Sequence, residues 1–204
     1  MYGLPEPTRV SKQLPKTSLY QTLAFKPQER RQVDNDVSRI DIVAQLTPQT
    51  LPALSQGKQT RSVNILRLTL KGERCAEQTL RLLARIPQAV LFALAYREQV
   101  RFALCYEGRI FISEPAAESE ATLSLQGSSF DDLWLHLVAQ VAGLDADSDM
   151  PLKAQIERRE HLRRLTDERD RTERKMWSTP QTHRRNELYA QLQQLNKQIN
   201  ELSQ

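Results

Sequence analysis

The residue types that most often carry catalysis or hold metals are few and scattered in this chain. Its histidines are His136, His161 and His183, and its cysteines are Cys75 and Cys105. No histidine has a second histidine or a cysteine at zinc-site spacing, and the cysteines form no CxxC pair. Walker, GxSxG and dinucleotide-binding motifs do not occur. We therefore expect no metal site, no cofactor and two free thiols, as is usual in a reducing cytoplasm.

Asp41 is the starting point for a nuclease hypothesis. It lies on a predicted strand, and restriction-type nucleases hold magnesium with an Asp and an acid-x-Lys motif on adjacent strands. The nearest second element is Glu107-Gly108-Arg109, in which arginine replaces the lysine. An arginine cannot lose its proton to act as a base, and a single acid holds a metal poorly. We assign no catalytic residue and keep a metal-dependent nuclease with a degenerate active site as an alternative function.

Basic residues are concentrated in two regions. In the first, Arg9, Lys12 and Lys16 have few acids nearby, and we predict that they contact nucleic acid or an acidic partner. In the second, residues 150–204 hold 12 Lys or Arg against 8 Asp or Glu, whereas residues 1–149 hold 17 of each. The arginines of this second region that could follow a phosphate backbone are Arg158, Arg159, Arg163 and Arg164. Acids at helical i+3 and i+4 spacing alternate with them, so a solvated helix is favoured over a nucleic-acid contact.

Apolar periodicity predicts a mixed β-sheet with flanking helices over residues 1–143. The predicted strands are 38–46, 61–71, 88–96, 100–106, 109–114 and 121–127. The predicted helices are 16–23, 26–37, 75–86 and a segment that Ser128 or Ser129 caps and that runs through Ala142. Trp134 lies on the inner face of this last helix and is predicted to anchor the core. The strand–helix–strand order of 61–96 indicates a parallel β-α-β unit, so we expect an α/β or α+β fold.

Residues 144–150 are predicted to form a linker. Residues 151–204, which follow it, are predicted to form a charged helical hairpin or coiled coil. We expect its helices at about 151–176 and 180–203. The turn WSTPQ lies between them, and Ser178 fits a capping box for the second helix.

The second helix of this predicted hairpin carries a regular apolar seam. Its members are Leu188, Leu192, Leu195, Ile199 and Leu202. The first helix offers only Leu162, Leu165 and Met176 in register. Because the mismatch leaves apolar surface unburied, we predict that the seam packs against a partner subunit or a second copy of the chain.

Several short stretches resemble one bacterial family over nearly the whole chain. They are GLPEPTRVSKQLPK, VSRIDIVAQLTPQT, VLFALAY, VRFALCY and FDDLWLHLVAQVAG, followed by a charged coiled-coil tail. In these features the chain is similar to the family known as domain of unknown function 4391. Members of that family are typically encoded beside helicases and DNA methyltransferases in restriction-like or phage-defence loci, so the resemblance implies an accessory role in DNA-directed defence. It supplies no catalytic residue that could be carried over.

These observations favour a non-enzymatic accessory subunit of a DNA-directed defence system. The expected partner is a neighbour-encoded helicase, methyltransferase or nuclease, and DNA or a second copy of the chain is left open as a further partner. A non-specific nucleic-acid-binding module is a third hypothesis. No apolar run approaches the roughly 20 residues that span a bilayer, and the N-terminus has no apolar signal core. We therefore expect a cytoplasmic protein without membrane contact.

Overall fold

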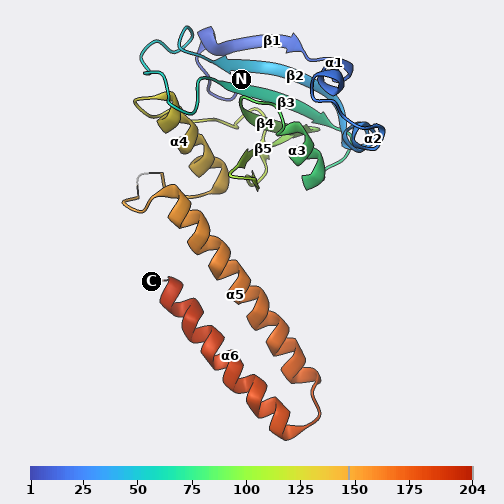
Figure 1. The fold of residues 1–204 in the computed structure, drawn as a ribbon, viewed down its shortest axis with the longest axis vertical. Helices are drawn as coiled ribbons and strands as arrows, with labels where there is room; N and C mark the ends of the chain where they lie inside the picture. The colour runs from blue at the N-terminus through green and yellow to red at the C-terminus, as the bar shows by residue number, and fades with distance from the viewer. Residues whose placement is uncertain (147, 204) are drawn as a thin grey trace. The chain divides into compact units, whose positions relative to one another are not determined.

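The computed structural model describes residues 1–146 and 148–203 of the chain. The chain divides into two compact units, Met1–Ala146 and Asp147–Gln204. The first combines a mixed β-sheet with helices α1 to α4, and the second contains the long helices α5 and α6 (Figure 1). The predicted class, a mixed sheet with flanking helices followed by a helical hairpin, is confirmed. Within the described ranges, none of the helices combines the length and apolar character needed to cross a bilayer.

A seven-stranded sheet forms the centre of the first unit. Its order is β1-β2-β3-β4-β5-β6, and β7 pairs with β5. The strands are β1 (Arg9–Gln13), β2 (Val37–Leu46), β3 (Val63–Leu70), β4 (Ala89–Tyr96), β5 (Gln99–Tyr106), β6 (Arg109–Ile112) and β7 (Ala116–Ala117). Strands β3 and β4 are parallel, and the other pairs are antiparallel. Helix α3 (Glu77–Leu83) connects the parallel pair, which confirms the predicted β-α-β unit.

Residues 121–127 form no strand, so that prediction is wrong. Ala121 and Leu123 are buried, which explains the alternating pattern in the sequence. The backbone nevertheless joins no ladder; instead the Leu123 N–H donates to the carbonyl of Tyr2 at 3.0 Å. The alternation reflects packing against the N-terminal segment, because burial of every second side chain does not by itself require a paired neighbour.

Helices α1 (Lys16–Thr22), α2 (Pro27–Asp36) and α3 cover one face of the sheet. Their buried side chains include Tyr20, Val33 and Leu80, which share a hydrophobic cluster with Leu68 and Phe92 of the central strands. Because successive residues of a strand point to opposite faces, only every second residue of β3 and β4 reaches this cluster. The remaining side chains of β3 and β4 point to the opposite face of the sheet, which must be covered by other elements.

Helix α4 (Phe130–Ala142) contributes to the cover of the opposite face through contacts with β5 and β6. Ser129 caps this helix, as predicted, because its hydroxyl accepts a hydrogen bond from the Asp132 N–H at 3.2 Å. Gly143 ends the helix with a φ of 64°, a left-handed conformation that glycine adopts without strain.

The first residues of the chain complete this second face. Tyr2 packs edge-on against Phe102 of β5, with ring centroids 5.3 Å apart. Leu4 is almost fully buried, and a short 3-10 turn, η1 (Glu6–Thr8), leads into β1. The N-terminal segment is therefore part of the core.

Trp134 is half-buried, although the sequence predicted a core anchor. The fully buried side chains of α4 include Phe130, Leu133 and Leu137. At 3.6 residues per turn, Trp134 is rotated by about 100° from Leu133 and lies at the edge of the buried stripe. The prediction failed because Trp134 lies beside the apolar stripe of α4, and the sequence pattern alone did not distinguish it from the residues within the stripe.

Helices α5 (Leu152–Ser178) and α6 (Thr182–Ser203) lie side by side and run in opposite directions, as a hairpin requires (Figure 1). Each boundary at the turn falls two residues later than predicted. Ser178 therefore belongs to the last turn of α5, where its hydroxyl donates to the Lys175 carbonyl at 3.1 Å. It does not cap α6, which corrects the predicted capping box.

Leu137 and Trp134 allow a direct comparison between a fully buried and a half-buried position of α4. Leu137→Ala should lower the free energy of unfolding by about 2–5 kcal/mol, because it leaves a closed cavity in the core. Trp134→Ala should cost less, because solvent can fill the space that the half-exposed ring vacates. Guanidinium-induced unfolding of the two variants measures both values, and a larger loss for Trp134→Ala would return this tryptophan to the core.

Candidate functional site

Two of the predicted N-terminal contact residues are exposed on the edge strand β1. Arg9 begins the strand, and its Nε atom donates to the carbonyl of Leu4 at 2.9 Å. Lys12 lies opposite Ile42 of β2, and the register shifts between Arg9 and Lys12. The role of both side chains as nucleic-acid or partner contacts stays a prediction.

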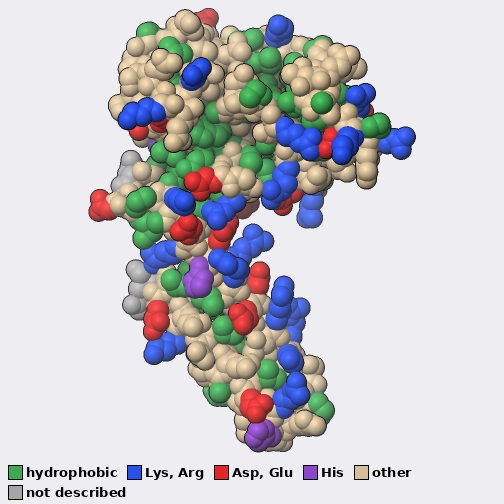
Figure 2. All heavy atoms as spheres, viewed as in Figure 1, with side chains coloured by type: hydrophobic (Ala, Val, Ile, Leu, Met, Phe, Trp, Pro, Cys, Tyr) green, Lys and Arg blue, Asp and Glu red, His purple; other side chains and the backbone are tan. Residues whose placement is uncertain are grey.

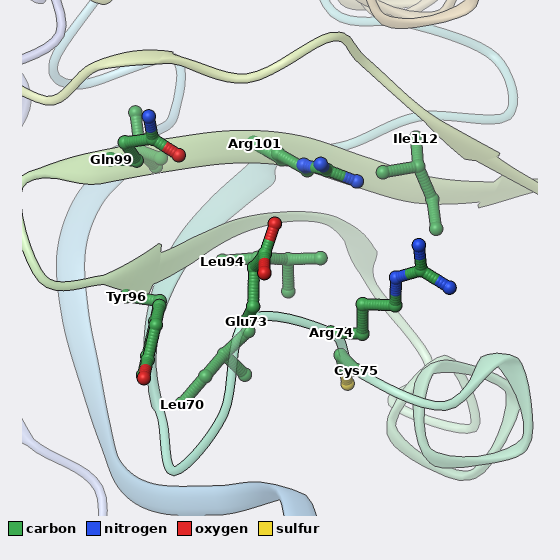
Figure 3. A pocket seen from close by; sticks show the side chains of 10 residues that line it. Leu70, Glu73, Arg74, Cys75, Leu94, Tyr96, Gln99, Arg101 and Ile112 are labelled. Atoms are coloured by element: carbon green, nitrogen blue, oxygen red, sulfur yellow. The ribbon is translucent and has the colours of Figure 1, made fainter.

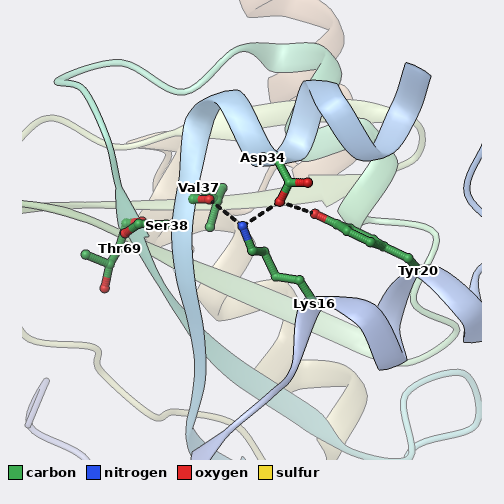
Figure 4. Close-up of polar contacts among 6 residues, drawn as sticks. All are labelled: Lys16, Tyr20, Asp34, Val37, Ser38 and Thr69. Atoms are coloured by element: carbon green, nitrogen blue, oxygen red, sulfur yellow. Dashed lines mark hydrogen bonds and ion pairs between the residues drawn. The ribbon is translucent and has the colours of Figure 1, made fainter. Parts of the chain in front are cut away.

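Lys16, the third of these residues, is held inside the α/β unit by two partners. Its Nζ atom pairs with the Asp34 carboxylate and donates to the Val37 carbonyl at 3.0 Å (Figure 4). Tyr20 donates to the same carboxylate at 2.9 Å. Burial raises the pKa of Asp34, but the hydrogen bonds from Lys16 and Tyr20 outweigh it and lower the pKa. The cluster ties α1 to the junction of α2 and β2, while phosphate contact by Lys16 stays a prediction.

A cleft of about 420 Å³ opens over strands β1, β2 and β3. Its lining residues are Met1, Arg9, Val10, Ser11, Arg39, Asp41, Ile42, Val43 and Arg67. We call it the arginine cleft, because three of its four charged residues are arginines. The β2–β3 register places Asp41 directly opposite Arg67, so backbone pairing brings these charges together. An excess of positive charge around a cleft favours an anionic ligand.

Arg67 is fixed in place by Glu118, which follows β7. Its Nε and Nη2 atoms donate to the two carboxylate oxygens of Glu118 at 2.7 and 2.9 Å, and Nη1 donates to Thr69 at 2.8 Å. Tyr2 donates to Glu118 at 2.8 Å. The Arg67 hydrogen bond lowers the pKa of Glu118, and burial together with Glu118 raises the pKa of Tyr2. The bidentate pair keeps the guanidinium charged and oriented beneath the cleft.

Asp41 faces an arginine in this structure. Its carboxylate accepts from Arg39 Nε at 2.8 Å and pairs with Arg39 Nη2 at 2.7 Å. Glu107, its suggested nuclease partner, lies in the β5–β6 turn, three strands away, which corresponds to about 14 Å across a sheet. Among the described residues, no group of three or more His, Cys, Asp or Glu is arranged to hold a metal ion.

A second, smaller cavity of about 170 Å³ lies near the other end of the sheet order. Its lining residues are Leu70, Glu73, Arg74, Cys75, Leu94, Tyr96, Gln99, Val100, Arg101 and Ile112 (Figure 3). Burial, with a smaller effect of the Asp36 carboxylate, raises the pKa of Cys75 to about 12, so its thiol stays protonated and unreactive at neutral pH. The cavity is below the roughly 300–1,000 Å³ of ligand pockets, whereas the arginine cleft falls within that range.

The predicted basic contacts of the tail lie along α5. Arg158 is half-buried, and its Nε atom donates to the Leu202 carbonyl at 2.8 Å, which joins the two helices. Arg159, Arg163 and Arg164 are exposed. Figure 2 shows acidic and basic side chains intermixed over the hairpin, as the solvated-helix interpretation expects. Nucleic-acid contact by these four arginines stays a prediction.

The predicted seam of α6 is divided in the hairpin. Leu188 and Leu195 are buried, whereas Leu192, Ile199 and Leu202 are partly exposed. The hairpin therefore uses only part of the seam, and contact of the remainder with a partner stays a prediction.

Sequence reasoning missed Arg39, Arg67, Glu118 and Tyr2 as members of the site. Arg67 carried a signal, because it is a charge within the otherwise apolar β3 sequence VNILRLTL, and a charge on a buried strand requires a partner. That partner, Glu118, lies 51 residues further along the chain. No local pattern points to a contact of such long range.

The fold and the site together define a mixed α/β domain with an arginine-lined cleft, followed by a helical hairpin. A family model described as Domain of unknown function (DUF4391) matches residues 2–199, so the chain belongs to that family. The resemblance inferred from the sequence is confirmed at this level. No curated protein and no solved structure matches the chain.

The Arg67–Glu118 pair predicts a specific acid sensitivity. The pKa of Glu118 is lowered from an ordinary value of 4.5 by the Arg67 hydrogen bond. Its stabilising contribution is therefore present above the unfolded-state pKa and is lost as the pH falls through the folded-state pKa. Glu118→Gln should cost about 1–3 kcal/mol at neutral pH and flatten the decline of the melting temperature below about pH 4.5.

Glu120→Gln is the matched control for this variant, because Glu120 is exposed two residues away. It should keep the melting temperature and the pH dependence of the parent protein. If Glu118→Gln declines as steeply in acid as the parent, the pair contributes nothing to folding and Arg67 is not anchored as described.

Proposed function

We propose that this chain is a non-enzymatic accessory subunit of a bacterial DNA-directed defence system of the restriction-like, anti-phage kind. In this role it binds a helicase, methyltransferase or nuclease subunit through the hairpin of α5 and α6. The defence context is supported by the resemblance to a family whose members are typically encoded beside such enzymes. The binding surface is supported by the exposed side chains of the hairpin.

Two large aromatic side chains on the hairpin carry this proposal. Trp177, in the last turn of α5, is 74% exposed, and Tyr189 of α6 is 54% exposed. Tryptophan and tyrosine are enriched among the residues that dominate binding energy at protein interfaces. Each can bury roughly 150–250 Å² of surface in such a contact. A partner that packs against these rings would remove this area from water.

The small core of the hairpin supports the same conclusion. Its buried apolar side chains are Ile156, Leu165, Met176, Leu188 and Leu195. The seam residues Leu192, Ile199 and Leu202 are left partly exposed along α6. Because full burial of such a side chain contributes up to about 1.5–3 kcal/mol, a helix packed along α6 would be stabilised by this seam.

Trp177→Ala combined with Tyr189→Ala tests the hairpin as a partner surface. Both side chains are exposed, so the substitutions should leave the melting temperature within about 2 °C of the parent value, as expected for surface changes. Association with purified neighbour-encoded subunits should weaken by about a hundredfold or more, since hot-spot residues cost at least about 2 kcal/mol each. Thermal unfolding measures the melting temperature, and titration calorimetry of the purified components measures the association.

The control is Ile112→Ala combined with Leu135→Ala, because both residues are exposed apolar side chains of the α/β unit. These substitutions should leave the association unchanged. The proposal fails if the parent chain is a monomer that binds none of the neighbour-encoded subunits, or if the aromatic pair can be replaced without loss of affinity.

A further inference from the structure

We propose that the arginine cleft of the α/β unit binds the phosphodiester backbone of nucleic acid. This goes beyond the proposed function, because it assigns a ligand to a surface that takes no part in the hairpin contact. The cleft is formed by β1, β2, β3 and Met1. It combines exposed guanidinium groups with an anchored one, a combination suited to phosphate oxygens.

Arg9 and Arg39 supply the groups that would touch the ligand. Arg9 is exposed, and its Nε atom donates to the Leu4 carbonyl at 2.9 Å, which orients the side chain; among the described residues it forms no ion pair. The Arg39 side chain is 56% exposed and meets Asp41 through Nε and Nη2, which leaves Nη1 for a second acceptor. A planar guanidinium held in this way loses little conformational freedom when it binds an anion.

Arg67 makes no direct contact in this proposal, and its charge is balanced by Glu118. Its three guanidinium nitrogens are used by Glu118 and Thr69. Asp41 and Glu118 together balance two of the three arginines of the lining, which leaves a net excess of one positive charge. Lys12, which is exposed on the same strand as Arg9, adds one further positive charge. A repeating polyanion gains more from such a field than a single carboxylate does.

The remaining lining indicates contact with the backbone rather than with the bases. The apolar lining residues are Met1, Val10, Ile42 and Val43, and none of the lining residues is aromatic. Base recognition of single strands depends on aromatic stacking, and recognition of duplex DNA depends on side chains that reach base edges. We therefore infer binding without sequence preference, with a strong dependence on salt.

Fluorescence anisotropy with labelled single-stranded DNA, duplex DNA and single-stranded RNA tests this site on the full-length protein. Arg9→Gln combined with Arg39→Gln should weaken binding of the preferred probe by about tenfold or more at low salt. The slope of log affinity against log salt should fall by about 1.4 for a single strand or about 1.8 for a duplex, as loss of two phosphate contacts requires. The three probes distinguish the sources of the phosphodiester, because the tightest of them identifies the ligand.

Two further variants make the result independent of folding. Arg31→Gln combined with Lys71→Gln removes two exposed charges outside the cleft lining and should change affinity by less than about twofold. Asp41→Asn removes a negative charge from the lining, while its amide oxygen can still accept a hydrogen bond from Arg39, and should tighten binding severalfold, an outcome that a damaged fold could not produce. The proposal is overturned if no probe binds at low salt, if the outside pair loses as much affinity as the cleft pair, or if Asp41→Asn weakens binding. The cleft variants should still bind the partner subunit, which would show that nucleic-acid binding and partner binding use different surfaces.

Discussion

The parallel pair of β3 and β4 is buried on both faces, and the rest of the α/β unit follows from that burial. Leu68 and Phe92 require the helices α1, α2 and α3 on one side. Ile65 and Leu91, which are fully buried and lie outside that cluster, require cover on the other. Helix α4 and the N-terminal segment contribute that cover, which explains why residues far apart in the sequence meet there.

Arg67 lies on β3 where the apolar cover of this second face gives way to the cleft. A guanidinium at such a position must find an acid, because a partly buried charge without a partner is costly. Glu118 supplies the acid, and Tyr2 binds the same carboxylate, so one pair also holds the chain terminus against the sheet. The same requirement that stabilises the fold therefore fixes the Arg67 guanidinium beneath the cleft.

Local patterns in the sequence were sufficient for most of the fold and for little of the site. Strand alternation, the strand–helix–strand order of 61–96 and the Ser129 cap each depend on neighbours in the chain, and the structure confirms them. The false strand at 121–127 and the half-buried Trp134 arose because periodicity reports burial without saying what provides it. The arginine cleft depends on the β2–β3 register and on a contact with Glu118, neither of which leaves a local signature.

We expect the α/β unit to fold without the hairpin, so that the hairpin can bind a partner without a loss of stability in the α/β unit. Amide hydrogen exchange of the full chain and of a fragment ending at Ala146 tests this most directly. We predict that the amides of β3 and β4 are the slowest to exchange in both, with equal protection, and that the fragment unfolds in one cooperative transition. Loss of protection in β3 and β4 of the fragment, or a broad non-cooperative transition, would contradict the claim and make the hairpin part of the fold.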